Sequence, residues 1–213
     1  MSIKDRKEKE KEIRRKQIMD TAENLFFKNG YENVTMADIA EGTELARSTL
    51  YLYFKNKEEI YLAIAIRGSK ILNKMFNESY KKGKTGIEKM TMLAEAFSKF
   101  YKEYPGYYNA NWFSHSVHFE EDFPEIDELI KIRTESFAIV GKTFQMGIKD
   151  GTIRSDADPV KSVLVLTASI QNVLNLTPAV ELHMKNNNLT HDELINYAVD
   201  MMIHSFENKQ AKK

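Results

Sequence analysis

The sequence predicts an all-α fold, with an N-terminal three-helix helix-turn-helix domain followed by a C-terminal helical domain. Two observations carry this prediction. Apolar residues recur at intervals of three and four along most of the 213 residues, as they do on one face of a helix. Pairs of residues that cap helix starts precede several of these stripes, such as Thr35 with Asp38 and Thr190 with Glu193.

Residues 2–16 are almost all charged, with alternating sign, and such a segment cannot bury a core. We expect a solvated helical extension or a disordered arm. The alternative is a basic arm that tracks a DNA backbone, with Arg14, Arg15 and Lys16 as the nearest candidates. An apolar stripe then predicts the first core helix, which Gly30 stops. This stripe comprises Ile18, Ala22, Leu25 and Phe26.

Residues 35–54 predict two short helices separated by a turn. Thr35 is the predicted N-cap of the first helix, because its hydroxyl can accept the Asp38 N–H while the Asp38 carboxylate reaches back. That helix should end near Gly42. The second helix should run from about Arg47 to Phe54.

The second of these helices has a side for the core and a side for solvent. Leu50 and Phe54 lie four residues apart and anchor the core side. The other side carries groups that suit DNA, because arginine can bond guanine edges while hydroxyl groups can bond phosphate. Lys57 adds charge at the start of the following helix. The solvent side comprises Arg47, Ser48, Thr49, Tyr51 and Tyr53.

A β-strand is the alternative for residues 49–54, because Leu50, Leu52 and Phe54 alternate with Tyr51 and Tyr53. No second strand pattern lies nearby to pair with it, and a lone strand leaves its backbone groups unpaired. The context therefore favours a helix.

Residues 13–63 resemble the N-terminal DNA-binding domain of the TetR family of bacterial and archaeal repressors. The sharpest match is the run STLYLYF at residues 48–54, followed by KEE at residues 57–59. The resemblance implies operator contacts at corresponding positions, and we add Lys55 to the set. The predicted DNA-binding residues are Thr35, Arg47, Ser48, Thr49, Tyr51, Tyr53, Lys55 and Lys57.

Two residues depart from the family pattern, which usually has glycine at both positions. Glu44 stands in the turn and is expected to adopt a positive φ at some cost. Ser48 lacks the bare backbone that allows close approach to DNA.

Asn56 with Glu59 predicts the start of a long helix, which links the DNA-binding head to the rest of the chain and could transmit a tilt. Residues 81–84 mark a loop, and Thr85 with Glu88 caps the next helix. The apolar residues of these two helices are Ile60, Ile64, Ile66, Ile71 and Met75, then Met92, Ala96, Phe97 and Phe100.

Residues 104–123 hold seven aromatic residues and the only tryptophan. Given a helix started by Pro105, an aromatic stripe falls on one face. Ordinary core packing explains such a stripe, and the lining of a ligand pocket with Asn109, Asn111 or His115 as polar handles is the alternative. The predicted ligand-binding residues are Tyr108, Trp112, His115, Phe119, Phe137 and Gln171. They favour a flat or lipophilic effector of low charge.

The C-terminal half predicts three further helices, one from Pro124 to about Gly151, one from Pro159, and one capped by Thr190. The helix from Pro159 is apolar on most sides and needs cover on most sides. With the last helix it suits a homodimer interface, as the resemblance also implies; closure of a monomer core is the alternative. A symmetric dimer would place two recognition helices about 34 Å apart or a multiple of that.

Composition excludes several classes of protein. The chain lacks cysteine, which rules out disulfides, thiolate metal sites and a catalytic thiol. No run of eighteen apolar residues exists and the N-terminus is highly charged, so we expect neither membrane span nor signal peptide, and a cytoplasmic protein. Lys and Arg balance Asp and Glu at 31 each. Residues 1–57 hold 12 Lys and Arg against 10 Asp and Glu. Because this excess is small, DNA binding must rely on locally placed charges, and it should be salt-sensitive.

These observations predict a homodimeric transcription regulator, a repressor that releases a double-stranded palindromic operator when a small effector binds. Residues 1–56 would form the DNA-binding part, and residues 57–213 the effector-binding and dimerisation part. We expect no catalytic activity, cofactor or metal. One alternative is a helical protein-interaction adaptor without operator binding. The other is an enzyme using the loosely spaced cluster from His115 to Asp122, which could also suggest a metal site.

Overall fold

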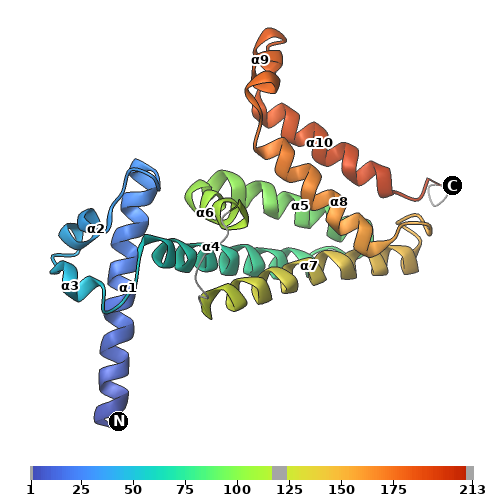
Figure 1. The fold of residues 1–213 in the computed structure, drawn as a ribbon. Coiled ribbons are helices and arrows are strands. Elements are labelled where there is room, and N and C mark those ends of the chain that lie inside the picture. The colour runs from blue at the N-terminus through green and yellow to red at the C-terminus, as the bar shows by residue number, and fades with distance from the viewer. Residues whose placement is uncertain (1, 117–123, 210–213) are drawn as a thin grey trace. The chain divides into compact units, whose positions relative to one another are not determined.

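The computed structural model describes residues 2–116 and 124–209, and over these residues it confirms the all-α prediction (Figure 1). The described residues form ten helices and no strand; Ile153 and Glu207 make an isolated bridge. The helices are α1 (Ile3–Asn29), α2 (Met36–Gly42), α3 (Arg47–Leu50), α4 (Lys57–Tyr80), α5 (Gly86–Glu103), α6 (Pro105–Ser116), α7 (Pro124–Asp150), α8 (Pro159–Leu174), α9 (Pro178–Asn186) and α10 (His191–Phe206).

Contacts group the chain into two compact units, which differ from the predicted division after residue 56. The first unit comprises residues 1–71 and 104–132, and the second comprises residues 72–103 and 133–213. The first unit extends beyond residue 56 because α6 packs beside α1 and the start of α4. Ala110 of α6 shares one buried cluster with Phe26 and Tyr61.

The core of the first unit follows the predicted stripe of α1. Ile18 and Ala22 are fully buried, and Phe26 is 3% exposed. The helix ends where predicted, because Gly30 adopts φ +82°, a conformation that favours glycine. Residues 3–16 continue the same helix as an almost wholly exposed charged extension. The helical extension is therefore confirmed over the disordered arm.

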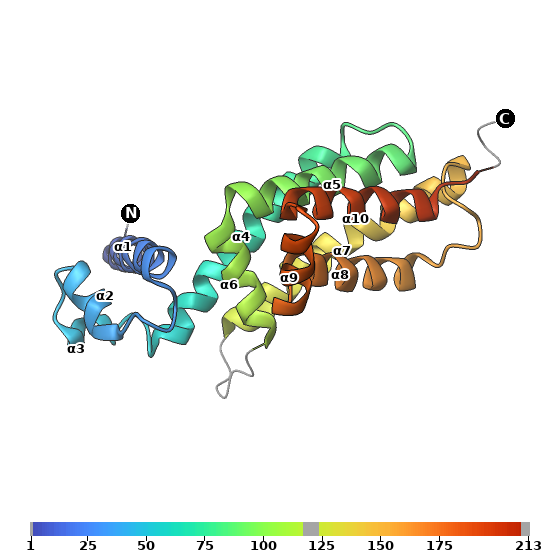
Figure 2. The same cartoon turned by 90° about the horizontal axis from the view of Figure 1, so that it is seen from above.

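In the second unit, α5, α7, α8 and α10 enclose a core around the fully buried Phe144. A close approach of α5 to α7 requires glycine, since a Cβ on Gly86 would lie 2.1 Å from the Gly147 Cα atom. α8 and α10 lie side by side in both views (Figures 1 and 2). The predicted cap at Thr190 is confirmed, and the Asp158 side chain caps the start of α8.

Helix α9 is an element that sequence analysis missed. Thr177 accepts the Val180 N–H, and Pro178 occupies the first turn, where its missing N–H costs nothing. The Thr-Pro pair was the available signal. In the described part of the chain no single helix is long and apolar enough to cross a membrane; α8 and α9, bent by 66°, pass that test only as a pair, by length and composition.

Candidate nucleic-acid interface

The start of α2 is fixed by the predicted capping box. The Asp38 N–H donates to the Thr35 hydroxyl at 3.3 Å, and the Thr35 N–H donates to the Asp38 carboxylate at 2.8 Å. The Thr35 hydrogen bonds hold the pKa of the Asp38 carboxyl below its usual range. A lowered folded-state pKa stabilises the fold above the unfolded-state pKa, and this contribution is lost as the pH falls through the folded-state value.

The turn between α2 and α3 has the predicted strained residue. Glu44 adopts φ +56°, and its N–H donates to the Glu41 carbonyl at 3.0 Å. The Leu45 N–H then donates to the Ala40 carbonyl at 2.9 Å, which closes the turn. A positive φ at a residue with a Cβ atom is unfavourable, and glycine would remove that cost.

Helix α3 is shorter than predicted, because it ends at Leu50 and not at Phe54. Beyond Leu50 the chain continues in tight turns, with the Leu52 N–H donating to the Thr49 carbonyl and the Tyr53 N–H to the Leu50 carbonyl. Bonds to the third residue back tighten the backbone beyond α-helical geometry. The strand alternative is wrong for the same reason. We call residues 47–54 the recognition segment.

The recognition segment separates buried from exposed side chains as predicted. Leu50 and Phe54 are 0% and 1% exposed. Arg47, Ser48 and Tyr51 are exposed, and Tyr51 retains 53% of its surface. Thr49 and Tyr53 are partly buried, and Lys55 beyond the segment is exposed. Leu52, which is 76% exposed, is an apolar surface residue that sequence analysis did not assign to the site.

Lys57 lies against the protein and not out in solvent. Its Nζ atom donates to the Tyr31 and Val34 carbonyls at 3.3 and 3.4 Å and sits 4.2 Å from the centre of the Tyr31 ring. Burial and a hydrogen bond to Glu58 raise the pKa of Tyr31, whose phenol therefore stays protonated. The phosphate contact of Lys57 stays a prediction, and the position shows a structural role for the ammonium group.

Arg15, one of the candidates named for a basic arm, is held by other groups of the protein. Its guanidinium lies 4.1 Å from the centre of the Phe54 ring and donates to the Tyr53 carbonyl at 2.7 Å. It also pairs with Glu59 at 3.0 Å and with Glu125 at 2.7 Å. These partners lie 38 to 110 residues away in sequence, so local patterns could not reveal them. Through Tyr53 and Phe54, Arg15 holds the end of the recognition segment against α1.

A second arginine, Arg67 of α4, and Tyr107 of α6 both bind acidic side chains of α1. Arg67 pairs with Asp20 and Glu23 of α1 at 2.7 Å each, and the Tyr107 hydroxyl donates to Glu23 at 2.8 Å. Asn111, proposed as a polar handle of a pocket, instead accepts from the Ser69 hydroxyl. The Asn111 side chain is thus engaged between α4 and α6.

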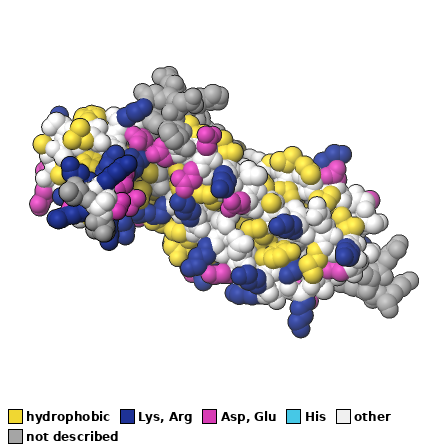
Figure 3. All heavy atoms as spheres, turned by 90° about the horizontal axis from the view of Figure 1, so that it is seen from below, with side chains coloured by type: hydrophobic (Ala, Val, Ile, Leu, Met, Phe, Trp, Pro, Cys, Tyr) yellow, Lys and Arg dark blue, Asp and Glu magenta, His cyan; other side chains and the backbone are white. Residues whose placement is uncertain are grey.

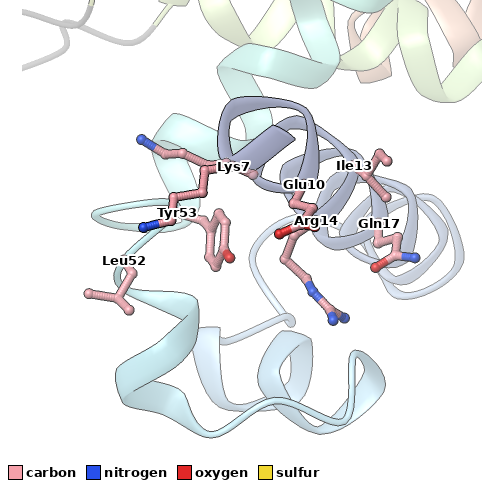
Figure 4. Close-up of a pocket in the computed structure, with 8 residues that line it drawn as sticks. Lys7, Glu10, Ile13, Arg14, Gln17, Leu52 and Tyr53 are labelled. Atoms are coloured by element: carbon pink, nitrogen blue, oxygen red, sulfur yellow. The ribbon is translucent and has the colours of Figure 1, made fainter. Parts of the chain in front are cut away.

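An open groove of about 640 Å³ runs between the N-terminal half of α1 and the recognition segment. In Figure 4 the Tyr53 ring and the Arg14 side chain point into the space between these two elements. The lining residues are Lys7, Glu10, Lys11, Ile13, Arg14, Gln17, Leu52 and Tyr53. Seen from below, Lys and Arg side chains gather around the N-terminal end of α1 (Figure 3).

The predicted ligand-binding residues are only partly described. Tyr108 of α6 is 6% exposed, whereas Trp112 is 37% exposed. Phe137 of α7, 37% exposed, and the partly buried Gln171 of α8 belong to the second unit. The His115 side chain and Phe119 lie outside the described residues, as do the side chains of the acidic cluster that ends at Asp122. Among the described residues no group of three His, Cys, Asp or Glu side chains could hold a metal ion.

Arg133 of α7 is a half-buried cation that sequence analysis did not single out. Burial lowers the pKa of its guanidinium to about 10, so the group remains charged at neutral pH.

Comparisons with known proteins agree with this geometry. Residues 18–64 match the family model of bacterial regulatory proteins of the tetR family. The fatty acid metabolism regulator protein of Bacillus subtilis is 32% identical over 85 residues, which cover 40% of this chain and 44% of that protein. This chain thus aligns with about half the length or less of the first curated relatives.

Solved structures share the fold over nearly the whole chain. FadR from Bacillus subtilis in complex with stearoyl-CoA has a TM-score of 0.66 and 19% identity, covering 88% of this chain and 96% of that one. AibR in complex with isovaleryl coenzyme A and operator DNA has a TM-score of 0.67 and 16% identity, covering 88% of this chain and 97% of that one. At these identities the likeness shows the fold alone.

Proposed function

The chain belongs to the TetR family of bacterial regulatory proteins, and from this premise we propose that it is a homodimeric, DNA-binding transcription regulator that acts as a repressor. The observation that carries this proposal is the recognition segment, where Arg47, Ser48 and Tyr51 stand exposed above the buried Leu50 and Phe54. Arginine reads base edges, and hydroxyl groups hold phosphates. The proposed contacts are Thr35, Arg47, Ser48, Thr49, Tyr51, Tyr53, Lys55 and Lys57. All of them except Lys57 lie in the proposed DNA-binding part, residues 1–56.

The homodimer would form through an apolar face on α8 and α10. Five large apolar side chains of these helices remain 56 to 70% exposed, which is unusual for one small region of a protein that acts alone. They are Val160, Leu164, Val165, Tyr197 and Met201. Two-fold pairing of this face would present two recognition segments to a palindromic operator.

The effector would be a small molecule bound by the C-terminal helices, with Tyr108, Trp112, His115, Phe119, Phe137 and Gln171 as its proposed contacts. Acyl coenzyme A thioesters are the first class to test, because two proteins of the same fold carry them. Their negative charge departs from the low-charge effector expected from the aromatic residues. Binding must differ between two conformations if it is to release DNA.

Selection of bound sequences from random duplex DNA tests this function. We expect a palindromic site, with affinity lowered about tenfold or more in Tyr51→Ala and with relaxed base preference in Arg47→Ala, each a loss of about 1–3 kcal/mol. A stable dimer that enriches no sequence at low salt, with or without acyl coenzyme A, would refute the function and favour an adaptor.

A further inference from the structure

The α1 extension holds eight basic and four acidic residues between Lys4 and Lys16, and half of the basic residues share one side of the helix. At 100° per residue, Lys4, Lys7, Lys11 and Arg14 fall on one stripe, which continues into the buried Ile18. The core side of α1 thus becomes a basic side where the helix extends past the core. Another side carries the acidic residues Asp5, Glu8 and Glu12.

The basic stripe borders the recognition segment directly. Lys7, Lys11 and Arg14 line the groove whose opposite wall is Leu52 and Tyr53 (Figure 4). The wall residues belong to the same turns that carry Tyr51, so the groove adjoins the proposed base-reading surface. The groove is open to solvent on both sides, since Leu52 is 76% exposed and Ile13 is 50% exposed.

The groove carries a net positive charge. Among the described residues that line it, Glu10 is the only acidic one, and Glu10 already pairs with Arg6 at 3.0 Å. Over the described residues, no ion pair is recorded for Lys7, Lys11 or Arg14. Unpaired cations beside an apolar wall suit a chain of phosphates with sugars between them, because the cations neutralise phosphate while Leu52 and Tyr53 contact sugar.

We propose that this groove is a second DNA-binding site, in which the α1 extension holds the phosphate backbone beside the base pairs that the recognition segment reads. The inference rests on the proposed function and extends it to Lys7, Lys11 and Arg14. These residues add affinity and salt dependence, and they leave base preference unchanged, since phosphate contacts carry no sequence information.

The test compares two double variants with the same change in charge. Lys7→Gln with Lys11→Gln removes two groove cations, whereas Lys9→Gln with Lys16→Gln removes two cations of the same helix that lie about 200° away from the stripe. Affinity is measured on the selected palindrome, and on random-sequence duplex DNA, from low to moderate salt. Circular dichroism and melting check that both variants fold.

We expect the groove variant to bind both duplexes roughly tenfold more weakly and to lose about 1.8 from the slope of log affinity against log salt for each protomer engaged. The control variant should keep most of the wild-type slope, and the sequence selected should be the same for all three proteins. Equal slopes for the two variants would overturn the groove as a site while leaving the proposed function intact. Failure of the wild type to bind any duplex would overturn both.

Discussion

Two surfaces of the molecule expose side chains above a buried row, and they differ in chemistry. The recognition segment exposes an arginine, hydroxyl groups and a tyrosine above Leu50 and Phe54. The face on α8 and α10 exposes aliphatic side chains such as Leu164 above the buried Val163 and Ala198. Hydrogen-bonding groups suit a polyanion, whereas aliphatic groups suit a second protein surface. The same helical architecture therefore supports two kinds of partner.

The largest expected effect comes from removing the buried support of the polar surface. Phe54→Ala should lower the free energy of unfolding by about 3–5 kcal/mol, because it deletes a fully buried ring and leaves a cavity. Urea unfolding measures this loss. Tyr51→Ala, on the exposed side of the same segment, should stay within about 0.5 kcal/mol of wild type. Equal losses for both would contradict the assignment of sides.

The apolar face can be broken by charge. Leu164→Lys should raise the dimer dissociation constant about 100-fold or more, because two-fold symmetry brings two buried like charges into one interface, at a cost of several kcal/mol. Leu52→Lys introduces the same change at a more exposed leucine of the other surface and should leave association unchanged. Sedimentation across a concentration series distinguishes them. Dimers of unchanged affinity in Leu164→Lys would place the interface elsewhere.

The adjacent Arg14 and Arg15 are expected to have different roles, one in binding DNA and the other in stabilising the fold. Arg15→Ala should lower the free energy of unfolding by about 2 kcal/mol, since it removes charge-assisted hydrogen bonds and leaves the nearly buried Glu59 without this partner. Arg14→Ala should change stability by less than about 0.5 kcal/mol and act on DNA affinity instead. The two effects would be measured by denaturant unfolding and by DNA titration. Interchanged outcomes would refute the roles given to this pair.

The smallest expected effect concerns the turn before the recognition segment. Glu44→Gly should raise the free energy of unfolding by about 0.5–1 kcal/mol, because glycine adopts φ +56° without a Cβ penalty. Glu41→Gly, inside α2, should lower it by about 1 kcal/mol. Thermal melts of the two variants test whether their changes in stability have opposite signs. A loss of stability in Glu44→Gly would show that the turn is unstrained.

Local rules predicted the parts of the fold that depend on near neighbours in sequence. The capping boxes at Thr35 and Thr190 were predicted because donor and acceptor lie three residues apart. The end of α1 at Gly30 follows from the freedom of glycine in φ. The positive φ of Glu44 was expected from the resemblance alone.

Contacts between distant segments escaped prediction. Nothing near Arg15 reveals that its partners lie on the recognition segment, α4 and α7, so the sequence offered it only a place in a solvated extension or, as the alternative, in a basic arm. Nothing in the aromatic run that forms α6 reveals that Ala110 packs with the core of α1. The end of α3 at Leu50 was missed because an α-helix and the tighter turns that follow it place side chains at similar intervals along the sequence.

We propose that paired apolar faces position two recognition segments on one DNA duplex. The most direct measurement is the stoichiometry and affinity of binding to the selected palindrome and to a duplex with one half-site, at fixed salt. We expect two protomers on the palindrome, binding far more tightly than to the half-site, and loss of this advantage in Leu164→Lys. Single protomers binding both duplexes with equal affinity would contradict the claim.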